Sequence, residues 1–255
     1  MFLCAMDISV VIITKNEAHI IEKTLQSLQG TFDDIIVVDS GSTDDTISIC
    51  KKYHARVIET SWNGYGANKN KGIDSAKNDW ILSLDADEVP DPELKKSMLQ
   101  VPLINDEVVF NIRFKNFFCA KLIRFGEWGF DSHVRIFNRK KVRWNDAAVH
   151  EKLILPNNYI ISVIEGYILH YTVQSRQEFV KKITTYARMN ANKYAASGKK
   201  SNFIKQYVSP VFSFVRNYIF RLGFLDGMEG FIIAKYNAYY TFLKYKYLSE
   251  MKNLD

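Results

Sequence analysis

The sequence predicts an α/β protein, with a mostly parallel sheet covered by helices on both faces and a helical extension after it. Short β-branched runs alternate with segments of helical spacing over the first ninety residues. Acidic residues follow the ends of those runs, and helix signals dominate from Ser175 onward. With 255 residues, 47% apolar and 24% charged, the chain is an ordinary globular protein. We expect a domain at 1–174, divided near residue 100, and an extension at 175–255.

The first half of the chain alternates strands and helices. Buried strands are expected at 8–13, 34–38, 56–59 and 80–84, and helices at about 17–29, 44–53 and 67–77. Gly30 is a plausible end for the first helix, and a turn with an N-cap follows the second strand. This alternation is typical of a parallel sheet with helices on both faces.

The middle of the chain differs from the first half. Aromatic and β-branched runs at 108–114, 134–137 and 159–163 are separated by turn residues, which predicts further strands. From Ser175 the pattern is helical to the end, and Pro210 is expected to separate two helices.

Charge and cysteine content narrow the class of protein. Residues 1–170 have a net charge of −3, whereas residues 171–255 have +9, with 14 basic against 5 acidic side chains. A segment as basic as 171–255 could bind nucleic acid, an anionic membrane or a phosphorylated substrate. Three scattered cysteines without a C-x-x-C pair indicate reduced thiols in a cytosolic protein. The apolar start, 1–5, is too short for a signal peptide, and charged residues interrupt every candidate membrane span.

Acidic residues follow three consecutive strong strands. They lie in Thr14–Glu17, Asp39–Asp44 and Asp85–Glu88. Open parallel sheets bind ligands at the carboxyl ends of their strands. The carboxylates of Asp85 and Asp87 can both face a divalent cation, and hard oxygens suit Mg²⁺ or Mn²⁺, which bridge phosphates. The alternative is a solvated turn with a helix cap.

Two other phosphate-binding patterns are absent from the sequence. Neither G-x-G-x-x-G nor G-x-x-x-x-G-K-[ST] occurs, and the first strand is followed by Thr-Lys-Asn-Glu. The sequence therefore predicts that phosphates are held through a metal and not by a glycine-rich loop.

Four motifs in order give the chain a family resemblance. Val10–Glu17, Ile36–Thr46, Asn70–Gly72 and Leu84–Asp87 resemble the successive motifs of family 2 glycosyltransferases, which have the GT-A fold. The dense match covers about residues 7–90. Later segments are similar to a narrower group that includes lipopolysaccharide core β-glucosyltransferases; they are Asp131–Phe137, Val149–Glu151 and Gly227–Ala234.

The resemblance implies a nucleotide-sugar half at about 7–100. Thr14, Glu17 and Asp39 would line the nucleotide pocket, with Asp39 accepting hydrogen bonds from base or ribose. Lys69 would lie near the nucleotide or diphosphate, where a cation offsets phosphate charge. The alternative for Lys69 is an exposed helix lysine.

The same resemblance implies a metal site. Asp87 would be the direct metal ligand, with Asp85 contacting the ribose or a metal-bound water. The metal would stabilise the leaving diphosphate as a Lewis acid. Related enzymes sometimes use a late histidine as a metal or diphosphate ligand, which suggests His170. The alternative for His170 is a histidine satisfied within the core.

An acceptor half is expected at about 101–174. Inverting transfer needs a base for the acceptor hydroxyl, and the resemblance points to Glu151, with Asp131 as the second choice. The alternative for Glu151 is a salt-bridged surface residue. His150 would orient Glu151 or touch the acceptor. Trp128 and Arg135 suit an acceptor site because an aromatic face stacks on sugar and an arginine meets phosphate or carboxylate.

The extension combines aromatic and basic side chains. Residues 203–248 hold fourteen Phe and Tyr interleaved with Lys and Arg. This composition suits helices in the interface of an anionic membrane, and equally helices packed on the catalytic domain. Nucleic-acid binding is the poorer interpretation because no recognition motif accompanies the charge.

The sequence as a whole predicts one activity and two rivals. We expect an inverting, metal-dependent transfer of a hexose, with glucose favoured, from a UDP-linked donor to a lipid-linked or envelope-glycan acceptor such as lipopolysaccharide core. The expected location is the inner face of the cell membrane, as a cytoplasmic peripheral protein. The rivals are a sugar nucleotidyltransferase, which would carry a glycine-rich basic loop after its first strand, and a non-catalytic scaffold derived from a transferase.

Overall fold

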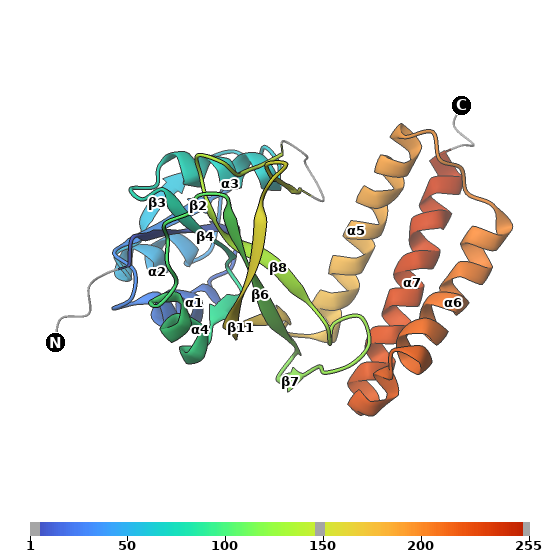
Figure 1. The fold of residues 1–255 in the computed structure, drawn as a ribbon. Coiled ribbons are helices and arrows are strands. Elements are labelled where there is room, and N and C mark those ends of the chain that lie inside the picture. Colours follow the sequence, from blue (N-terminus) through green and yellow to red (C-terminus); the bar gives the residue numbers. More distant parts are fainter. Residues whose placement is uncertain (1–5, 146–150, 252–255) are drawn as a thin grey trace. The chain divides into compact units, whose positions relative to one another are not determined.

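The computed structural model describes residues 6–145 and 151–251 and divides into two compact units (Figure 1). The first unit is Met1–Phe114 with Ser132–His170, and the second is Lys115–Asp131 with Tyr171–Asp255. Strands β6 (Val108–Phe118) and β11 (Ile160–Val173) pass from one unit into the other. The second unit thus includes residues 115–131 as well as the C-terminal helices, a grouping that the sequence pattern does not reveal.

The first unit contains the expected parallel strands. They are β1 (Ile8–Thr14), β2 (Asp34–Asp39), β3 (Arg56–Glu59) and β4 (Trp80–Asp85), adjacent in the order β3-β2-β1-β4. All three pairings among them are parallel. The predicted α/β class with a parallel sheet is confirmed.

Antiparallel strands extend this sheet beyond β4. Its order continues β8-β6-β11-β5, and the pairs β4–β8, β6–β8 and β11–β5 are antiparallel. The additional bounds are β5 (Glu88–Pro90), β7 (Lys121–Leu122), β8 (Ser132–Asn138), β9 (Arg143–Trp144) and β10 (Leu153–Ile154), and the last two form a separate small sheet. The three later strands expected from the sequence exist, and β6 and β11 are longer than predicted.

Four helices belong to the first unit: α1 (Ile21–Leu28), α2 (Thr46–Lys52), α3 (Tyr65–Asp74) and α4 (Pro92–Met98). Helix α1 begins later than the predicted residue 17. The backbone N–H groups of Asn16, Glu17 and Ala18 donate to side chains after β2, so this stretch follows that loop instead of helical geometry. Helix α4 begins at an Asp91 cap, whose carboxylate accepts from the N–H of Leu94 at 2.8 Å.

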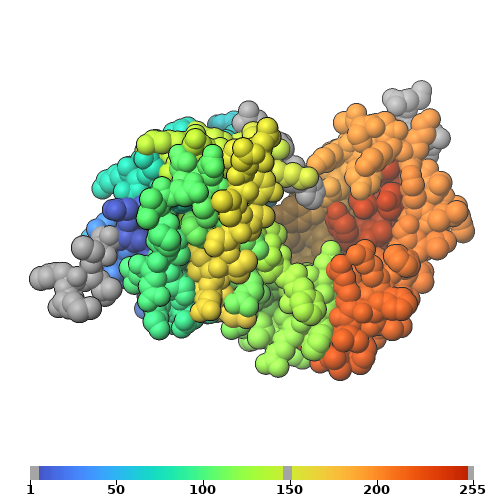
Figure 2. All heavy atoms as spheres, in the orientation of Figure 1, coloured from blue at the N-terminus to red at the C-terminus, as the bar shows by residue number. Residues whose placement is uncertain are grey.

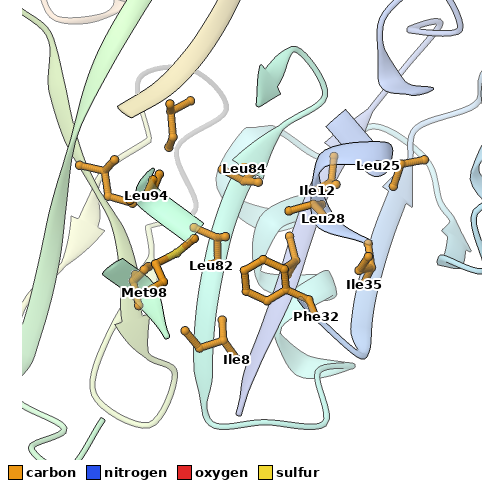
Figure 3. Close-up of a cluster of buried hydrophobic side chains, with 14 of the residues drawn as sticks. Ile8, Ile12, Leu25, Leu28, Phe32, Ile35, Leu82, Leu84, Leu94 and Met98 are labelled. Carbon is orange, nitrogen blue, oxygen red and sulfur yellow. The ribbon is translucent and has the colours of Figure 1, made fainter. Parts of the chain in front are cut away.

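Both faces of the parallel strands β1, β2 and β4 are buried. Val10 and Ile12 face one cluster with α1 and α4, which Figure 3 shows, and Val11 and Ile13 face a second cluster with α3. Continuous burial on both faces explains why these strands read as unbroken apolar runs. Gly72 allows α3 to approach closely, because a Cβ there would lie 2.5 Å from a methyl carbon of Val11.

The second unit is helical. It contains α5 (Arg176–Ala196), α6 (Ser209–Val215), α7 (Gly227–Met251), two π-helical segments η1 (Ile204–Val208) and η2 (Arg216–Phe220), and a 3₁₀ turn η3 (Gly223–Asp226). In Figure 1, α7 lies between α5 and α6 and contacts both. Ser175 caps α5 by accepting from the N–H of Glu178 at 3.1 Å.

Pro210 has a different effect from the one predicted. It lies in the first turn of α6, directly after η1, so no loop separates the two helical segments. A proline lacks the N–H that would bond to a carbonyl of the preceding turn, and here the preceding turn is the wider π-helical segment η1. No helix in the described part of the chain is long and apolar enough to cross a membrane.

Candidate active site

The ends of the central strands bring the predicted residues of the first unit to one edge. Thr14 at the end of β1 is level with Asp39 of β2, and Asp85 at the end of β4 is level with Ile13. These three residues therefore occupy neighbouring strands at the carboxyl edge of the sheet, where open α/β sheets bind ligands.

The loop after β2 is organised around Asp39. Its buried carboxylate accepts from the N–H groups of Gly41 at 2.9 Å and Ser42 at 2.8 Å. Next to it, the hydroxyl of Thr14 is buried and has no hydrogen-bond partner among the residues that the structure describes. Buried hydroxyl groups are rarely left unpaired, so an unpaired one at this edge fits a site completed by a ligand. Glu17, half-exposed, lies where the loops after β1 and β2 are hydrogen-bonded together.

Asn16 and Ser42 are loop residues to which the sequence analysis assigned no role. The side chain of Asn16, at φ +56°, accepts from the N–H of Thr43 at 2.8 Å, and Ser42 accepts from the N–H of Asn16 at 2.8 Å. The run of Asn, Ser and Asp around these positions is a turn signal that could have indicated this pairing of loops.

Lys69 connects two predicted site residues. Its Nζ lies 2.9 Å from Oε1 of Glu151 and 3.2 Å from Oδ1 of Asp85, and 4.5 Å from the ring centre of Trp144. The lysine is only 2% exposed, so the alternative of an exposed helix lysine is wrong. A buried ammonium group needs carboxylate partners, and the fold supplies them from β4 and from the segment after β9.

Helix α3 is positioned by the lack of a side chain at Gly66 and by the side-chain amide of Asn70. A Cβ on Gly66 would lie 1.9 Å from the carbonyl oxygen of Asn145. The amide of Asn70 donates to the carbonyl of Trp144 at 2.8 Å and accepts from its N–H at 3.1 Å. These contacts bring the chain after β9 against α3, and this proximity lets Lys69 reach Glu151.

Arg135 and Glu88 form a buried ion pair at the same edge. Arg135 donates to Glu88, and its Nη2 lies 3.5 Å from Oδ2 of Asp85. Glu88 also accepts from the N–H of Asp85 at 3.1 Å. The predicted acceptor arginine therefore lies buried among the carboxylates after β4, and its acceptor role stays a prediction. The sequence analysis assigned Glu88 no role; a charged residue inside the apolar run 134–137 was the signal that Arg135 needs a buried partner.

The charges of this cluster shift the pKa values of its carboxyl groups. Burial alone would raise the pKa of Asp85, but Lys69 and Arg135 outweigh it and hold that pKa below its usual value. Burial and the neighbouring Asp85 raise the pKa of Glu88 even though Arg135 opposes them. The cluster therefore keeps an ionised Asp85 next to the predicted phosphate region.

Asp87 and His170 also lie together. Nε2 of His170 is 3.4 Å from Oδ2 of Asp87, and His170 pairs with Glu88 across β11 and β5. Burial would lower the pKa of His170, but Asp87 and then Glu88 and Asp85 raise it above its usual value. His170 is thus in contact with the acidic motif, as a metal or diphosphate ligand would have to be; its role as a ligand stays a prediction.

The donor set fits a loosely held divalent cation. The carboxylates of Asp85 and Asp87 are the hard oxygen ligands that Mg²⁺ and Mn²⁺ prefer, whereas the imidazole of His170 suits a transition metal such as Mn²⁺ better than Mg²⁺. Among residues 6–145 and 151–251, no three His, Cys, Asp or Glu side chains are arranged to hold a metal by themselves. Mg²⁺ commonly binds through one or two carboxylates together with substrate phosphates, and this site matches that chemistry.

The remaining predicted site residues are Trp128, Asp131 and His150. Trp128 and Asp131 belong to the second unit, where the Trp128 ring packs 5.5 Å from that of Phe179 and Asp131 accepts from Asn116 at 3.4 Å. The acceptor role of Trp128 and the base role of Asp131 stay predictions. His150 lies outside the described residues.

Comparisons with known proteins place this site in a family. The model of glycosyl transferase family 2 matches residues 9–150, more than half of the chain. An uncharacterized glycosyltransferase of Rickettsia bellii is 29% identical over 96% of this chain and 86% of its own length. The lipopolysaccharide core biosynthesis glycosyltransferase LpsC of Rhizobium meliloti is 29% identical over 93% of this chain and 90% of its own.

Solved structures match a smaller part of the chain. Glucosyl-3-phosphoglycerate synthase from Mycobacterium tuberculosis, solved in complex with Mn²⁺, UDP and glucosyl-3-phosphoglycerate, is 28% identical, with a TM-score of 0.34 over 43% of each chain. The matched family residues contain the parallel strands, Lys69 and the carboxylates after β4, and the GT-A class predicted from the motifs agrees with this sheet. The chain belongs to glycosyl transferase family 2.

Proposed function

We propose that this protein is an inverting, metal-dependent hexosyltransferase that uses a UDP-linked sugar, with glucose favoured, and an envelope-glycan or glycolipid acceptor. The observation that carries the proposal is the contact of Lys69 with both Asp85 and Glu151, at 3.2 and 2.9 Å. It brings the proposed base and the proposed diphosphate region to one place at the sheet edge.

The donor is held by the strand-end loops in this proposal. Thr14 and Asp39 contact the nucleoside. There a buried hydroxyl, unpaired within the described part of the chain, and a turn-forming carboxylate lie on neighbouring strands at the same level. Lys69 attracts the diphosphate. Arg135 and Glu88 hold Asp85 in position from behind, because Arg135 contacts both carboxylates.

Besides the two substrates, the proposed reaction uses a divalent cation. Asp87, Asp85 and His170 would hold it together with phosphate oxygens, and when bound it stabilises the negative charge of the leaving diphosphate. These three side chains are part-exposed, but Lys69, Glu88 and Arg135 next to them are buried, which strengthens electrostatic interactions within the site.

Transfer then proceeds by a single displacement. The acceptor hydroxyl oxygen attacks the anomeric carbon, the bond from that carbon to the diphosphate oxygen breaks, and Glu151 accepts the hydroxyl proton. One displacement inverts the anomeric configuration. Glu151 is a suitable base because its carboxylate lies at this edge and is only 16% exposed as a side chain.

The acceptor class rests on one relative. LpsC is named for lipopolysaccharide core biosynthesis and aligns with nearly the whole chain at 29% identity. This similarity supports a lipopolysaccharide-core or related envelope acceptor for the present chain. An acceptor of this class is attached to lipid, which supports the proposed association with the inner face of the cell membrane.

Activity of two variants tests the proposal. Asp87→Asn and Glu151→Gln should each lower transfer at least about 100-fold, while Asp87→Asn should also weaken Mn²⁺-dependent hydrolysis of the donor. Glu22→Gln is the matched control, since Glu22 is an ion-paired carboxylate on α1 outside the site. Wild-type turnover in either site variant would remove the role assigned to that residue.

A donor screen identifies the sugar. Thermal unfolding is measured with Mn²⁺ and each nucleotide sugar, because a ligand that binds only the native state raises its apparent stability. NMR of the product reports the anomeric configuration, and retention would exclude the single displacement. Release of pyrophosphate from a nucleoside triphosphate and a sugar phosphate would instead indicate the nucleotidyltransferase.

A further inference from the structure

The helical run at 203–220 in the second unit has an exposed apolar face. Eight large apolar or aromatic side chains along it are exposed: Phe203, Ile204, Tyr207, Val208, Val211, Phe212, Ile219 and Phe220. We name this set the apolar stripe. Singly exposed apolar residues are common, but a contiguous apolar patch marks a surface that binds something.

The spacing of the stripe matches the geometry of its helix. Exposed pairs recur every four residues, at 203–204, 207–208 and 211–212, and again at 219–220. An α-helix has about 3.6 residues per turn, so a repeat of four would gradually rotate around it. The π-helical segments η1 and η2 have wider turns and offset this rotation. The helix geometry therefore keeps the stripe along one side.

The other side of the run is held by α7. The rings of Phe214 and Tyr218 lie 5.8 and 5.7 Å from the ring of Phe231, and Asn217 is buried. Within the stripe, Tyr207 also packs on α7, with its ring 6.0 Å from that of Phe242, whereas Phe212 and Phe220 are 61% and 73% exposed and contribute little to packing within the second unit. Phe130, 82% exposed, lines the same pocket as Phe220 and extends the apolar surface beyond the helix.

Charges on the run that carries the stripe have one sign, although the exposed Glu127 lines the pocket with Phe130 and Phe220. Between Ser197 and Leu225 there are five basic residues and no acidic one; the basic residues are Lys199, Lys200, Lys205, Arg216 and Arg221. The next acidic side chain, Asp226, is buried and accepts from the N–H of Phe125 at 2.8 Å. Glu229 is paired with Lys121 at 2.8 Å. The cations by the stripe therefore lack acidic neighbours within their own segment.

We propose that the apolar stripe and its cations dock on an anionic lipid bilayer, with the stripe at the boundary between headgroups and acyl chains. Exposed aromatic and aliphatic side chains suit that boundary, and Lys205 and Arg216 on the same run suit lipid phosphates. This narrows the expected membrane contact from the whole of 175–255 to the run at 203–220, whose residues lie in the orange surface of Figure 2. The inference holds whether or not the proposed transfer reaction is correct.

Co-sedimentation with vesicles of stated composition tests the inference on the full chain. Wild-type protein should sediment with vesicles of phosphatidylcholine containing 30% phosphatidylglycerol. Phe212→Ser with Phe220→Ser should lower the partition coefficient at least about tenfold, since each ring buries apolar area in the bilayer. The matched control is Ile104→Ser, because Ile104 is 89% exposed but belongs to the first unit. It should bind as the wild type does.

A variant with two cations removed measures the electrostatic contribution to vesicle binding. Lys205→Gln with Arg216→Gln should lower binding to the anionic vesicles roughly 25-fold, since each cation adds about 1 kcal/mol, about a fivefold change. On pure phosphatidylcholine the same variant should match the wild type. Equal losses on both vesicle types would contradict a role for anionic lipid.

Two further measurements keep the result interpretable. Phe220→Trp should gain fluorescence that brominated acyl chains quench, whereas Ile104→Trp should not. The proposal is overturned if the wild-type protein does not bind anionic vesicles. It is also overturned if the protein forms a dimer that the Phe212 and Phe220 substitutions dissociate, because the stripe would then bind a second copy. Donor hydrolysis in lipid-free buffer should persist in the stripe variants, so failure here is distinguishable from failure of the proposed transfer.

Discussion

Replacing Arg135 by methionine should reveal how the carboxylates after β4 are held. Arg135 is the cation that contacts both Glu88 and Asp85, and it is 7% exposed. Methionine keeps much of the side-chain volume and its contact with Phe114, over whose ring the guanidinium lies at 5.3 Å. The change therefore removes the charge more than the packing.

The structure predicts that the two single variants lose different amounts of stability. Arg135→Met leaves Glu88, 1% exposed, without its cation, and removal of one partner from a buried pair costs about 3–5 kcal/mol. Glu88→Gln leaves Arg135 still facing Asp85, so it should cost only about 1–2 kcal/mol. The double variant removes both charges and should be more stable than Arg135→Met alone.

Urea unfolding followed by tryptophan fluorescence measures these differences in the free energy of unfolding. A pH series then tests whether the loss of stability grows or shrinks as pH falls. The pKa of Glu88 is already raised by burial and by Asp85, and loss of Arg135 raises it further. A folded-state pKa above the unfolded value gives stability that is lost as pH rises. The deficit of Arg135→Met against wild type should therefore shrink as pH falls from 8 to 5.

Either of two results would refute this reasoning. A loss below about 1 kcal/mol for Arg135→Met would show that the pair is neutral or solvated. An equal or larger loss for Glu88→Gln would show that Asp85 does not compensate Arg135, contrary to the 3.5 Å contact.

Three other predictions follow from single contacts. Gly66→Ala should lower activity at least about tenfold and stability by about 1–3 kcal/mol, because its Cβ would lie 1.9 Å from the carbonyl of Asn145; unchanged kinetics would contradict the close approach. Lys69→Met should lower kcat/KM about 100-fold by removing the cation between Asp85 and Glu151, measured as sugar transfer, and near-normal transfer would disprove its role. Asp34→Asn should cost about 1–3 kcal/mol at pH 7. Burial opposes ionisation, but the N–H of Lys77, then Ser9 and Arg56, hold the pKa of Asp34 below its usual value. The stability difference between the wild type and Asp34→Asn should therefore disappear as pH falls from 5 toward the lowered pKa, which acid unfolding curves would show. A stability difference that stays constant over this range would contradict the prediction.

Local residues were enough to predict the parallel half of the fold. Strands buried on both faces need unbroken apolar runs, so β1, β2 and β4 could be read directly, and β3 begins and ends at the predicted residues. Parallel strands expose their carboxyl ends at one edge, which made the neighbourhood of Thr14, Asp39 and Asp85 predictable before any coordinates.

The later strands and the helix starts were harder. β11 runs for 14 residues, and much of its first part is exposed, so apolar periodicity marks only a short piece of it. Helix α1 starts late because loop side chains 26 to 29 residues away bind its would-be first turn. Sequence spacing carries no information about such partners.

By itself, the sequence determined the α/β class, the order of the motifs and the set of acidic, basic and aromatic residues that chemistry could use. Only the tertiary structure decided which of them meet: Lys69 with Glu151, 82 residues apart, and Arg135 with Glu88, 47 residues apart. The physical reason is that a buried charge must find a partner of opposite sign, and that partner is chosen by the packing of α3, β4, β8 and the chain after β9, not by distance along the chain. The same holds for the apolar stripe, because exposure is set by which face of the run packs on α7.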